Sequence, residues 1–351
     1  MTLPARIGIT GAAGFIGSNL AERLLDRGAE VVGVDDLSMG SLRNLSGMLD
    51  DPSFSFSEFD CRDSRQLRRA FAGCDAIVHL AAMKIPRYGG AMETLEINVD
   101  GSHAAFEVGL ATGAHVVLAS TSDVYGNAVP PFAEDDPIVL GPPTSRRWSY
   151  AASKYFDEHL ALRMVEERDL KCTILRFFNA YGIRNHPTWW GGPLSVFFED
   201  LLDGKLMELH GDGRQVRSFT YVTDTVDGIV RTLERPETSG EVINIGNDEP
   251  ISIVKLAQQV QDAMGIAGPL RAKEVSLADI GGKYQDVQVR IPNMRKAFEL
   301  LGFRAEVGLA EGLEKTLAWH RMLREGLIRR AIGVWSQIGR ASCRERVCHN
   351  V

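Results

Sequence analysis

The chain has 351 residues, of which 44% are hydrophobic and 24% charged, the balance of an ordinary globular protein with one large domain or two modest ones. Its formal net charge of −7 argues against a nucleic-acid-binding protein, because neutralising phosphates needs a basic face. No apolar run approaches the roughly 20 residues that span a bilayer, and the first residues lack the apolar segment of a secretion signal. Five cysteines without a Cys-x-x-Cys pair indicate reduced thiols and no metal site. We therefore expect a cytoplasmic protein.

Short β-branched runs alternate with amphipathic stretches through the first half of the chain. The runs predict strands over residues 6–10, 30–35, 53–59, 76–80, 115–120 and 172–176. The stretches between them predict helices over residues 15–27, 64–71, 92–111 and 150–168. Repeated strand–helix–strand units imply parallel strands with helices on both faces. Residues 1–180 are therefore expected to form an α/β Rossmann domain built on a doubly wound parallel sheet.

The rhythm changes after Phe177, where helices and short strands mix irregularly. Residues 181–325 are expected to form a smaller, α-rich substrate-binding domain that is interleaved with the first. Residues 326–351 are expected to be a tail, in which 338–351 look like the in-frame translation of a sequencing adaptor. We expect this last stretch to be a read-through artefact, and the alternative is a natural disordered basic tail.

A glycine-rich turn, Gly11-Ala12-Ala13-Gly14-Phe15-Ile16-Gly17, joins the first expected strand to the first expected helix. Glycines at this spacing allow a tight turn, close approach of the backbone to a pyrophosphate, and close packing of helix on strand. The helix N-terminus adds free N–H groups and a partial positive charge. The turn therefore predicts a dinucleotide-binding site.

Asp35 ends the second expected strand, where a carboxylate accepts hydrogen bonds from the ribose hydroxyls of a dinucleotide. Asp36 follows directly, and two acids would repel the 2′-phosphate of NADP. The prediction is therefore NAD. The alternative for Asp35 is that it caps the turn after the strand.

Two further segments carry groups suited to removing a proton from a hydroxyl. Residues 120–126, Ser-Thr-Ser-Asp-Val-Tyr-Gly, follow a buried strand, and Tyr150-Ala151-Ala152-Ser153-Lys154 opens a helix. Tyr150 and Lys154 are four residues apart and share one face of that helix. A tyrosine has a pKa of about 10, and a nearby ammonium group lowers that pKa so that the phenol becomes a usable base.

At this point the chain resembles the extended short-chain dehydrogenase/reductases, in particular their nucleotide-sugar epimerases, dehydratases and decarboxylases. The resemblance covers about residues 5–322. It rests on the glycine turn, on residues 120–126, on Tyr150-x-x-x-Lys154, on residues 176–182 and on residues 211–224. It implies NAD as cofactor and a nucleoside-diphosphate sugar, expected to be UDP-linked, as substrate. It also implies a homodimer formed through the helices at 92–111 and 150–168.

The resemblance implies roles for individual residues. Tyr150 would be the catalytic base, Lys154 would orient the nicotinamide ribose, and Thr121 would be the bridging hydroxyl, with Ser122 as the alternative. The implied cofactor contacts are Gly11, Gly14, Phe15, Ile16, Gly17, Asp35, Asp60, Cys61, Leu80, Ala81, Ala82, Lys84, Tyr150, Lys154 and Phe177. The implied substrate contacts are Lys84, Thr121, Ser122, Asp123, Tyr150, Asn179, Arg217 and Arg290. Lys84 could instead be an exposed lysine, and the two arginines could instead form ion pairs between domains.

Members of this group begin alike, by oxidising the C4 hydroxyl of the sugar. Their dehydratases carry an Asp-Glu pair directly after the bridging threonine, where this chain has Ser122-Asp123, so a 4,6-dehydratase is not expected. The decarboxylases show Thr-Ser-Glu-Val-Tyr-Gly, which residues 121–126 match except for one methylene, and Arg290 stands where their Arg-x-Pro segment falls. The Trp148–Lys154 context resembles the epimerases instead.

The sequence therefore favours an NAD-dependent nucleotide-sugar 4-epimerase, with UDP-glucuronate decarboxylase as the alternative. A different class, a non-catalytic NAD-binding scaffold or sensor, would be expected to lack Thr121, Tyr150 or Lys154. All three residues are present.

Overall fold

A computed structural model describes residues 2–84, 90–276 and 286–326 of the chain. The predicted tail, apart from its first residue, lies outside the described residues, and so does the stretch expected to be an artefact. Within the described residues, no helix has both the length and the apolar composition needed to cross a bilayer.

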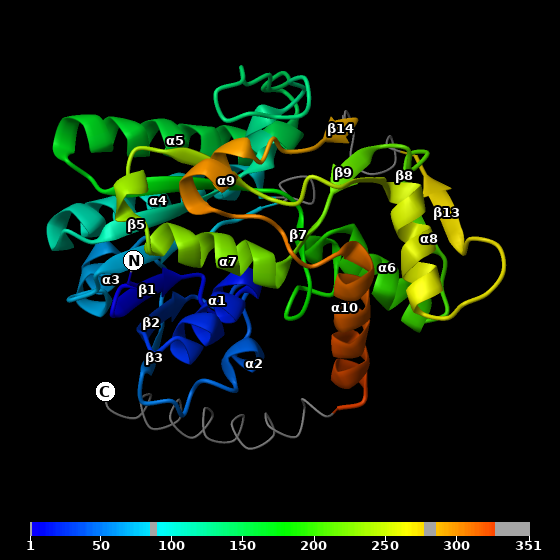
Figure 1. The fold of residues 1–351 in the computed structure, drawn as a ribbon, viewed down its shortest axis with the longest axis horizontal. Coiled ribbons are helices and arrows are strands. Elements are labelled where there is room, and N and C mark those ends of the chain that lie inside the picture. Colours follow the sequence, from blue (N-terminus) through cyan, green and yellow to red (C-terminus); the bar gives the residue numbers. More distant parts are fainter. Residues whose placement is uncertain (1, 85–89, 277–285, 327–351) are drawn as a thin grey trace, which may run out of the picture.

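A seven-stranded parallel sheet forms the centre of the molecule (Figure 1). Its strands are β1 (Arg6–Thr10), β2 (Glu30–Asp35), β3 (Phe54–Glu58), β4 (Ala76–His79), β5 (His115–Thr121), β6 (Cys172–Phe177) and β11 (Val242–Ile245). Their order is β11-β6-β5-β4-β1-β2-β3, and every neighbouring pair is parallel. The six strands predicted from the sequence are confirmed. The seventh, β11, follows residue 180 in the chain.

Helices cover both faces of the sheet, as the strand–helix rhythm predicts. Helices α1 (Phe15–Asp26) and α7 (Val222–Leu233) lie together on one face, and α3 (Ser64–Ala70), α4 (Ala91–Thr112) and α5 (Ser149–Arg168) lie on the other (Figure 1). The strands supply side chains to both layers. Val31 of β2 belongs to the core cluster that contains Leu20 of α1, whereas its neighbour Val32 belongs to the cluster that contains Leu67 of α3 and Phe106 of α4. Strands buried on both faces read as continuous apolar runs, which is why the sequence reveals them.

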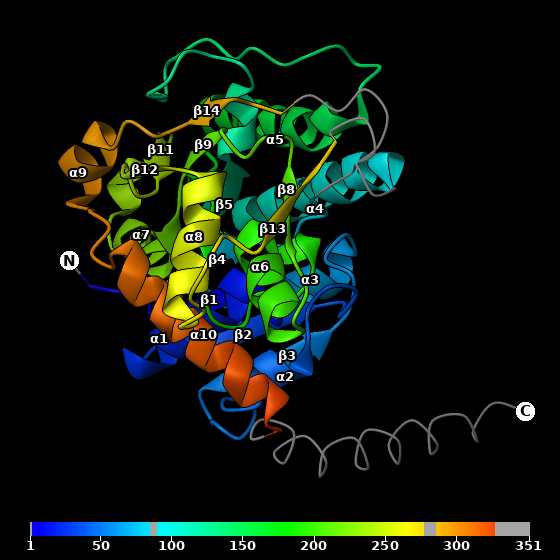
Figure 2. The same ribbon diagram turned by 90° about the vertical axis from the view of Figure 1, so that its right-hand side faces the viewer.

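A second group of elements stands beside the carboxyl ends of the strands (Figure 2). It contains the helices α6 (Pro193–Leu202), α8 (Ile253–Ala263) and α10 (Leu309–Arg324). Strand β8 (Met207–His210) pairs with β13 (Ala272–Val275), and β9 (Val216–Ser218) lies between β12 (Pro250–Ser252) and β14 (Val289–Arg290). The bridge to the sheet is made by β7 (Ala180–Tyr181) and β10 (Thr220–Tyr221).

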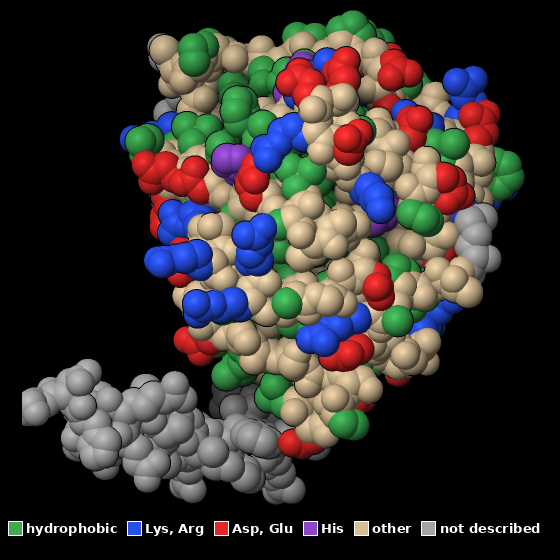
Figure 3. All heavy atoms as spheres, turned by 90° about the vertical axis from the view of Figure 1, so that its left-hand side faces the viewer, with side chains coloured by type: hydrophobic (Ala, Val, Ile, Leu, Met, Phe, Trp, Pro, Cys, Tyr) green, Lys and Arg blue, Asp and Glu red, His purple; other side chains and the backbone are tan. Residues whose placement is uncertain are grey.

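Short elements complete the described chain: helices α2 (Leu42–Leu45) and α9 (Arg295–Leu301), and the 3-10 turns at Ser122–Tyr125, Arg146–Trp148, Trp189–Gly191 and Pro236–Thr238. Helix α7 and strand β11 come after residue 180 yet belong to the sheet layers. The chain thus leaves the sheet region and returns to it. On the face seen in Figure 3, acidic side chains lie among the basic ones, and no single sign of charge covers that face.

Candidate active site

A cavity of about 810 Å³ lies between the carboxyl ends of the central strands and the second group of elements. In an open parallel sheet this is where ligands bind. All the residues predicted to contact cofactor or substrate line this cavity except Lys154, which is buried behind it. The structure therefore brings together residues that are spread over most of the chain.

The glycine turn forms one wall of the cavity, and its geometry requires glycine at two positions. Gly11 has a φ of 72°, a conformation that side chains disfavour. A Cβ atom at Gly17 would lie 2.1 Å from the carbonyl oxygen of Gly11. Helix α1 begins directly after Gly14 without a side-chain cap. Its first residues line the cavity, and uncapped amides at a helix N-terminus suit a pyrophosphate.

Asp35 both supports the turn and faces the cavity. Its Oδ2 accepts a hydrogen bond from the Ala13 amide at 3.0 Å, and its Oδ1 accepts one from the Leu37 amide at 2.8 Å. The capping role that the sequence left as an alternative is therefore real. Burial raises the pKa of Asp35, and these amides oppose the rise. Each carboxylate oxygen keeps a second lone pair for a ribose hydroxyl.

Asp60 and Cys61 line the part of the cavity beyond β3. Asp60 forms an ion pair with Arg62 at 2.5 Å. Burial raises the pKa of the Cys61 thiol to about 12, so this cysteine stays neutral and offers shape and packing rather than charge.

Tyr150 and Thr121 meet at the base of the cavity. Tyr150 lies in the first turn of α5, Thr121 ends β5, and their side chains share a hydrogen bond. Thr121 Oγ1 also accepts a hydrogen bond from the Asp123 amide at 3.2 Å. Ser122, the alternative hydroxyl, is buried beside them and lines the cavity. Burial raises the pKa of Tyr150, the charge of Asp123 adds to the rise, and the bond from Thr121 opposes it.

Lys154 lies one helical turn after Tyr150, with only 1% of its side chain exposed. Its Nζ is 3.4 Å from Oδ2 of Asp157, an ion-pair contact too long for a good hydrogen bond. Among the described residues, Nζ has no hydrogen-bond partner. A buried ammonium group demands such partners, and the hydroxyls of a nicotinamide ribose would supply them. The residues present therefore fit a nicotinamide dinucleotide.

A buried ion pair fixes Thr121 relative to Tyr150. Glu158 of α5 accepts a hydrogen bond from Ser120 Oγ at 2.5 Å. Arg176 of β6 donates to both carboxylate oxygens of Glu158, at 3.0 and 2.7 Å. Such fork-to-fork pairs set orientation as well as distance. The end of β5 and the start of α5 are thus held in one arrangement.

Asp123 lies between two arginines at the edge of the cavity. Its Oδ1 is 2.7 Å from Nη2 of Arg147 and 2.6 Å from Nη2 of Arg290. Burial raises the pKa of Asp123, but these two guanidinium groups more than offset it and hold the pKa below its usual range. The sequence placed Arg290 on the substrate and missed Arg147. The available signal was its position three residues before Tyr150, close to the same helix face.

Arg217 stands beside Arg290 as its register partner in the pairing of β9 with β14. It forms an ion pair with Asp286 at 2.9 Å, and its Nη1 donates to the carbonyl oxygen of Val216 at 2.8 Å. The ion pair of Arg290 with Asp123 joins the two predicted domains, as the alternative had it, whereas Arg217 and Asp286 both lie within residues 181–325. Both arginines line the cavity. Asn179, with a φ of 36°, donates from Nδ2 to the Ser218 carbonyl oxygen at 2.8 Å.

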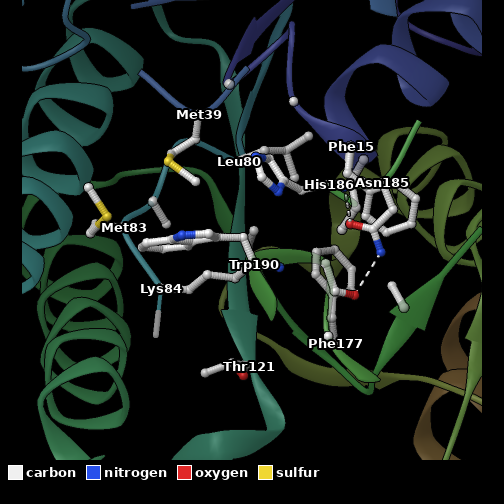
Figure 4. Close-up of a pocket in the computed structure, with 18 of the residues that line it drawn as sticks. Phe15, Met39, Leu80, Met83, Lys84, Thr121, Phe177, Asn185, His186 and Trp190 are labelled. Carbon is white, nitrogen blue, oxygen red and sulfur yellow. Dashed lines mark hydrogen bonds between the residues drawn. The ribbon is translucent and has the colours of Figure 1, made fainter. Parts of the chain in front are cut away.

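Two tryptophans from the loop before α6 line the cavity. The sequence analysis did not assign either of them to the site. The Trp190 indole extends across the cavity toward Met83, with Lys84 beside it (Figure 4). Trp189 stacks on His210 of β8, with ring centroids 4.0 Å apart and planes at 23°. Aromatic faces of this kind can hold a sugar ring or a base.

A parallel sheet of this order, with a glycine turn after its first strand and an acid at the end of its second, defines a dinucleotide-binding Rossmann protein. Residues 7–246 match the model of the NAD dependent epimerase/dehydratase family, and the chain belongs to that family. Its cofactor is NAD.

The comparisons with single proteins point to more than one reaction. The chain is 33% identical over 318 residues to a UDP-N-acetyl-alpha-D-glucosaminuronate decarboxylase from Bacillus cytotoxicus, covering 89% of this chain and 97% of the relative. It is 32% identical over 320 residues to a UDP-glucose 4-epimerase from Mycolicibacterium smegmatis, covering 89% and 97%. A crystal structure of a UDP-glucuronic acid 4-epimerase variant from Bacillus cereus, with a UDP-4-deoxy-4-fluoro-glucuronic acid and NAD, is 27% identical with a TM-score of 0.81 and covers 91% and 99%.

Proposed function

We propose that the protein decarboxylates a UDP-linked hexuronate, oxidising its C4 hydroxyl and then releasing the C6 carboxyl group as CO₂. The choice of a uronate as substrate rests on two arginines, Arg147 and Arg290, which hold Asp123 beside Tyr150 and Thr121. The choice of decarboxylation rests on the likeness to a UDP-N-acetyl-alpha-D-glucosaminuronate decarboxylase. The proposal reverses the order of the two reactions that the sequence suggested.

The arginine pair favours a substrate with its own carboxylate. A guanidinium group recognises a carboxylate through a planar fork of donors. Nη2 of Arg290 and Nη2 of Arg147 both form ion pairs with the same oxygen of Asp123. Both arginines also line the cavity, where a substrate carboxylate would meet them. A neutral hexose would offer hydroxyls only, and would leave a costly mismatch with this charged wall.

In this proposal the first step is oxidation of the C4 hydroxyl of the sugar. Tyr150, as a phenolate, accepts the proton of the C4 hydroxyl, and Thr121 donates a hydrogen bond to the same oxygen. Bound NAD supplies the acceptor for the C4 hydride. Lys154 favours the phenolate because its positive charge is buried nearby.

Oxidation at C4 makes the sugar a β-keto acid, in which C5 joins the ketone to the carboxylate. The C5–C6 bond then breaks, its electron pair passes through C5 to the C4 oxygen, and CO₂ leaves. Thr121 and the protonated Tyr150 donate hydrogen bonds to the oxygen on which negative charge grows. A proton from water adds at C5 and restores the C4 ketone. Return of the hydride to C4, with the proton of Tyr150 passing back to the C4 oxygen, then gives a UDP-pentose.

C4 epimerisation is the second candidate, and the likeness to a UDP-glucose 4-epimerase supports it. It needs the same Tyr150, Thr121 and Lys154, followed by rotation of the 4-keto sugar and return of the hydride to its other face. An epimerase that acts on a uronate would also use Arg147 and Arg290. The two reactions therefore use the same residues for the first oxidation, and they are told apart by their products.

The test is to incubate the purified protein with NAD and, separately, UDP-glucuronate, UDP-N-acetylglucosaminuronate and UDP-glucose. We expect CO₂ and a UDP-pentose or its N-acetylamino counterpart from one of the uronates, detected by gas analysis and proton NMR. A C4-inverted product without CO₂ would replace decarboxylation by epimerisation. No turnover of any of the three, with NAD bound, would favour the scaffold or sensor. Tyr150→Phe serves as the inactive control.

A further inference from the structure

A second buried carboxylate lies close to Lys154 on the side of α4. Asp157 is three residues after Lys154 on α5, and its side chain has no exposed surface. Its Oδ2 is 3.4 Å from Lys154 Nζ and accepts a hydrogen bond from Ser102 Oγ of α4 at 2.8 Å. A fully buried carboxylate is rare unless it is paired. Nothing in the family-derived assignment of Thr121, Tyr150 and Lys154 calls for an acid here.

Asp157 belongs to a polar seam between α4 and α5. One turn earlier, Asn98 of α4 donates to Ser153 Oγ at 2.9 Å, and Ser153 Oγ donates to the carbonyl oxygen of Tyr150 at 2.9 Å. The seam therefore fixes the turn of α5 that carries Tyr150 and Lys154. The hydrogen bond from Ser102 to Asp157 is the next contact along this seam. It orients the Asp157 carboxylate toward Lys154.

Most of the other titratable groups around Tyr150 and Lys154 are neutral or already paired, so few charges can change the pKa of Tyr150. Burial, with help from Lys154, lowers the pKa of His79 on β4 to about 3, so this histidine is neutral. Cys61 is neutral as well. Glu158 is held by Arg176 at 2.7 Å. Among the charges near Tyr150, Asp123 and Asp157 oppose the phenolate and Arg290 favours it. The buried ammonium group of Lys154, one helical turn away, is expected to favour it as well.

We propose that Asp157 is a positioning residue that holds the Lys154 ammonium group and offsets part of its charge at Tyr150. The physical reason lies in what Tyr150 must do: it takes a proton in the first half of the cycle and returns it in the second. A base with that task works best when its pKa lies near the working pH. Lys154 and an oxidised nicotinamide both lower the pKa of Tyr150, and a carboxylate at Asp157 limits the fall. This rests on the proposed role of Tyr150 and not on the fate of the 4-keto sugar.

Neutralising Asp157 is expected to lower the pKa of Tyr150. Asp157→Asn keeps the shape of the side chain and removes its negative charge. The Tyr150 phenolate is then more stable, so the pKa of Tyr150 falls. We expect the acid limb of kcat/KM against pH to move to lower pH by about one unit. Below that limb, the variant should turn over faster than the parent enzyme.

Two measurements separate this effect from a merely structural one. The pH profile is recorded for whichever product the parent enzyme forms, with Ser102→Ala as the matched control, because that change removes the hydrogen bond but keeps the charge. Tyrosinate absorbance is then titrated in the NAD-bound protein without substrate, as the difference between each protein and its Tyr150→Phe counterpart. This second titration does not depend on decarboxylation. We expect the Tyr150 titration to shift down in Asp157→Asn and much less in Ser102→Ala.

Three results would overturn the proposal. Equal Tyr150 titrations in the parent and Asp157→Asn would show that Asp157 carries no charge that Tyr150 senses. A shift to higher pH would mean that Asp157 serves to keep Lys154 protonated. An equal shift in Ser102→Ala would assign the effect to packing. If Asp157→Asn does not fold, Asp157→Ser carries the same test with a smaller neutral side chain.

Discussion

Asp123, Asp157 and Glu158 lie on or beside the helix that carries Tyr150, and each faces a cation. Glu158 is taken up by Arg176, Asp157 by Lys154, and Asp123 by Arg147 and Arg290. In a site of low dielectric constant a charge without a partner is costly. The first two pairs are buried away from the cavity, with Lys154 left to meet the cofactor, whereas Asp123 and its two arginines line the cavity. A charged substrate can therefore act on the third pair without disturbing the other two.

Arg147 provides the residue-scale prediction. Arg147→Gln removes one guanidinium group from the wall that we assign to the substrate carboxylate, and charge-assisted contacts of this kind contribute about 1.5–3 kcal/mol. We expect the Kd for UDP-glucuronate to rise by roughly 10-fold or more, and the Kd for UDP-glucose to stay within about 2-fold. Calorimetry or tryptophan fluorescence in the Tyr150→Phe background measures both without turnover.

Arg146→Gln is the matched control for that experiment, because Arg146 is the exposed neighbour of Arg147 and does not line the cavity. It removes the same net charge from the protein. Equal weakening of both ligands by Arg147→Gln would show that Arg147 supports the site as a whole. If Arg147→Gln and Arg146→Gln raise the Kd for UDP-glucuronate equally, the cause is the change in net charge and not a contact made by Arg147.

At the scale of elements, the turn between β1 and α1 carries the strongest steric demand. A Cβ atom at Gly17 would lie 2.1 Å from the Gly11 carbonyl oxygen and 2.9 Å from Ala12 Cα. Both are backbone atoms, so relief requires α1 to move away from β1. We expect Gly17→Ala to lower the free energy of unfolding by about 2–3 kcal/mol and to weaken NAD binding.

Denaturant unfolding and NAD titration check this prediction, with Gly47→Ala as the control. A Cβ atom at Gly47 would meet nothing within 4 Å, so this variant should be nearly neutral in both measurements. Unchanged NAD affinity in a destabilised Gly17→Ala would separate packing from cofactor binding. Unchanged stability would mean that the turn between β1 and α1 can accommodate a methyl group at Gly17 by a small backbone shift.

The elements differ in how far the sequence could reveal them, and the reason is the range of their partners. The first six strands were predictable because their apolar runs and the helices between them are local signals. Strand β11 was not, because the pairing of Val242 with Ile174 joins distant parts of the chain. The same holds for the site. Tyr150 and Lys154 stand at helical spacing, but the contacts of Asp123 with Arg290 and of Asp157 with Ser102 exist only once the chain has folded.

At the scale of the whole molecule, the chain crosses several times between the sheet and the second group of elements. Loop residues after β7 are tied to the sheet region: Arg184 forms an ion pair with Glu22 of α1 at 2.7 Å, and Asn19 of α1 donates to the Ile183 carbonyl oxygen at 3.2 Å. These bonds tie the segment after β7 to α1. We therefore expect the two regions to unfold together, and we keep the boundary at residue 180 as a prediction.

The outer surface of α4 and α5 carries large apolar side chains that the fold leaves exposed. Met92 and Leu95 of α4 are 69% and 37% exposed, and Phe156 of α5 is 52% exposed. The resemblance drawn from the sequence predicted a homodimer through these two helices. A two-fold contact would place each patch against its own copy and form a four-helix interface. We therefore propose that α4 and α5 form the dimer contact.

Phe156→Glu tests this directly, because a two-fold axis brings one new carboxylate from each subunit into the same interface. We expect the dimer dissociation constant to rise by roughly 100-fold, observed by sedimentation or by light scattering over a dilution series. Phe298→Glu is the control: Phe298 is 49% exposed on α9, outside α4 and α5, so its replacement should leave the dimer intact. A parent protein that is monomeric at all concentrations would remove the interface altogether. A dimer that survives Phe156→Glu but not Phe298→Glu would move it to the other side of the sheet, where α9 packs with α7 and β11.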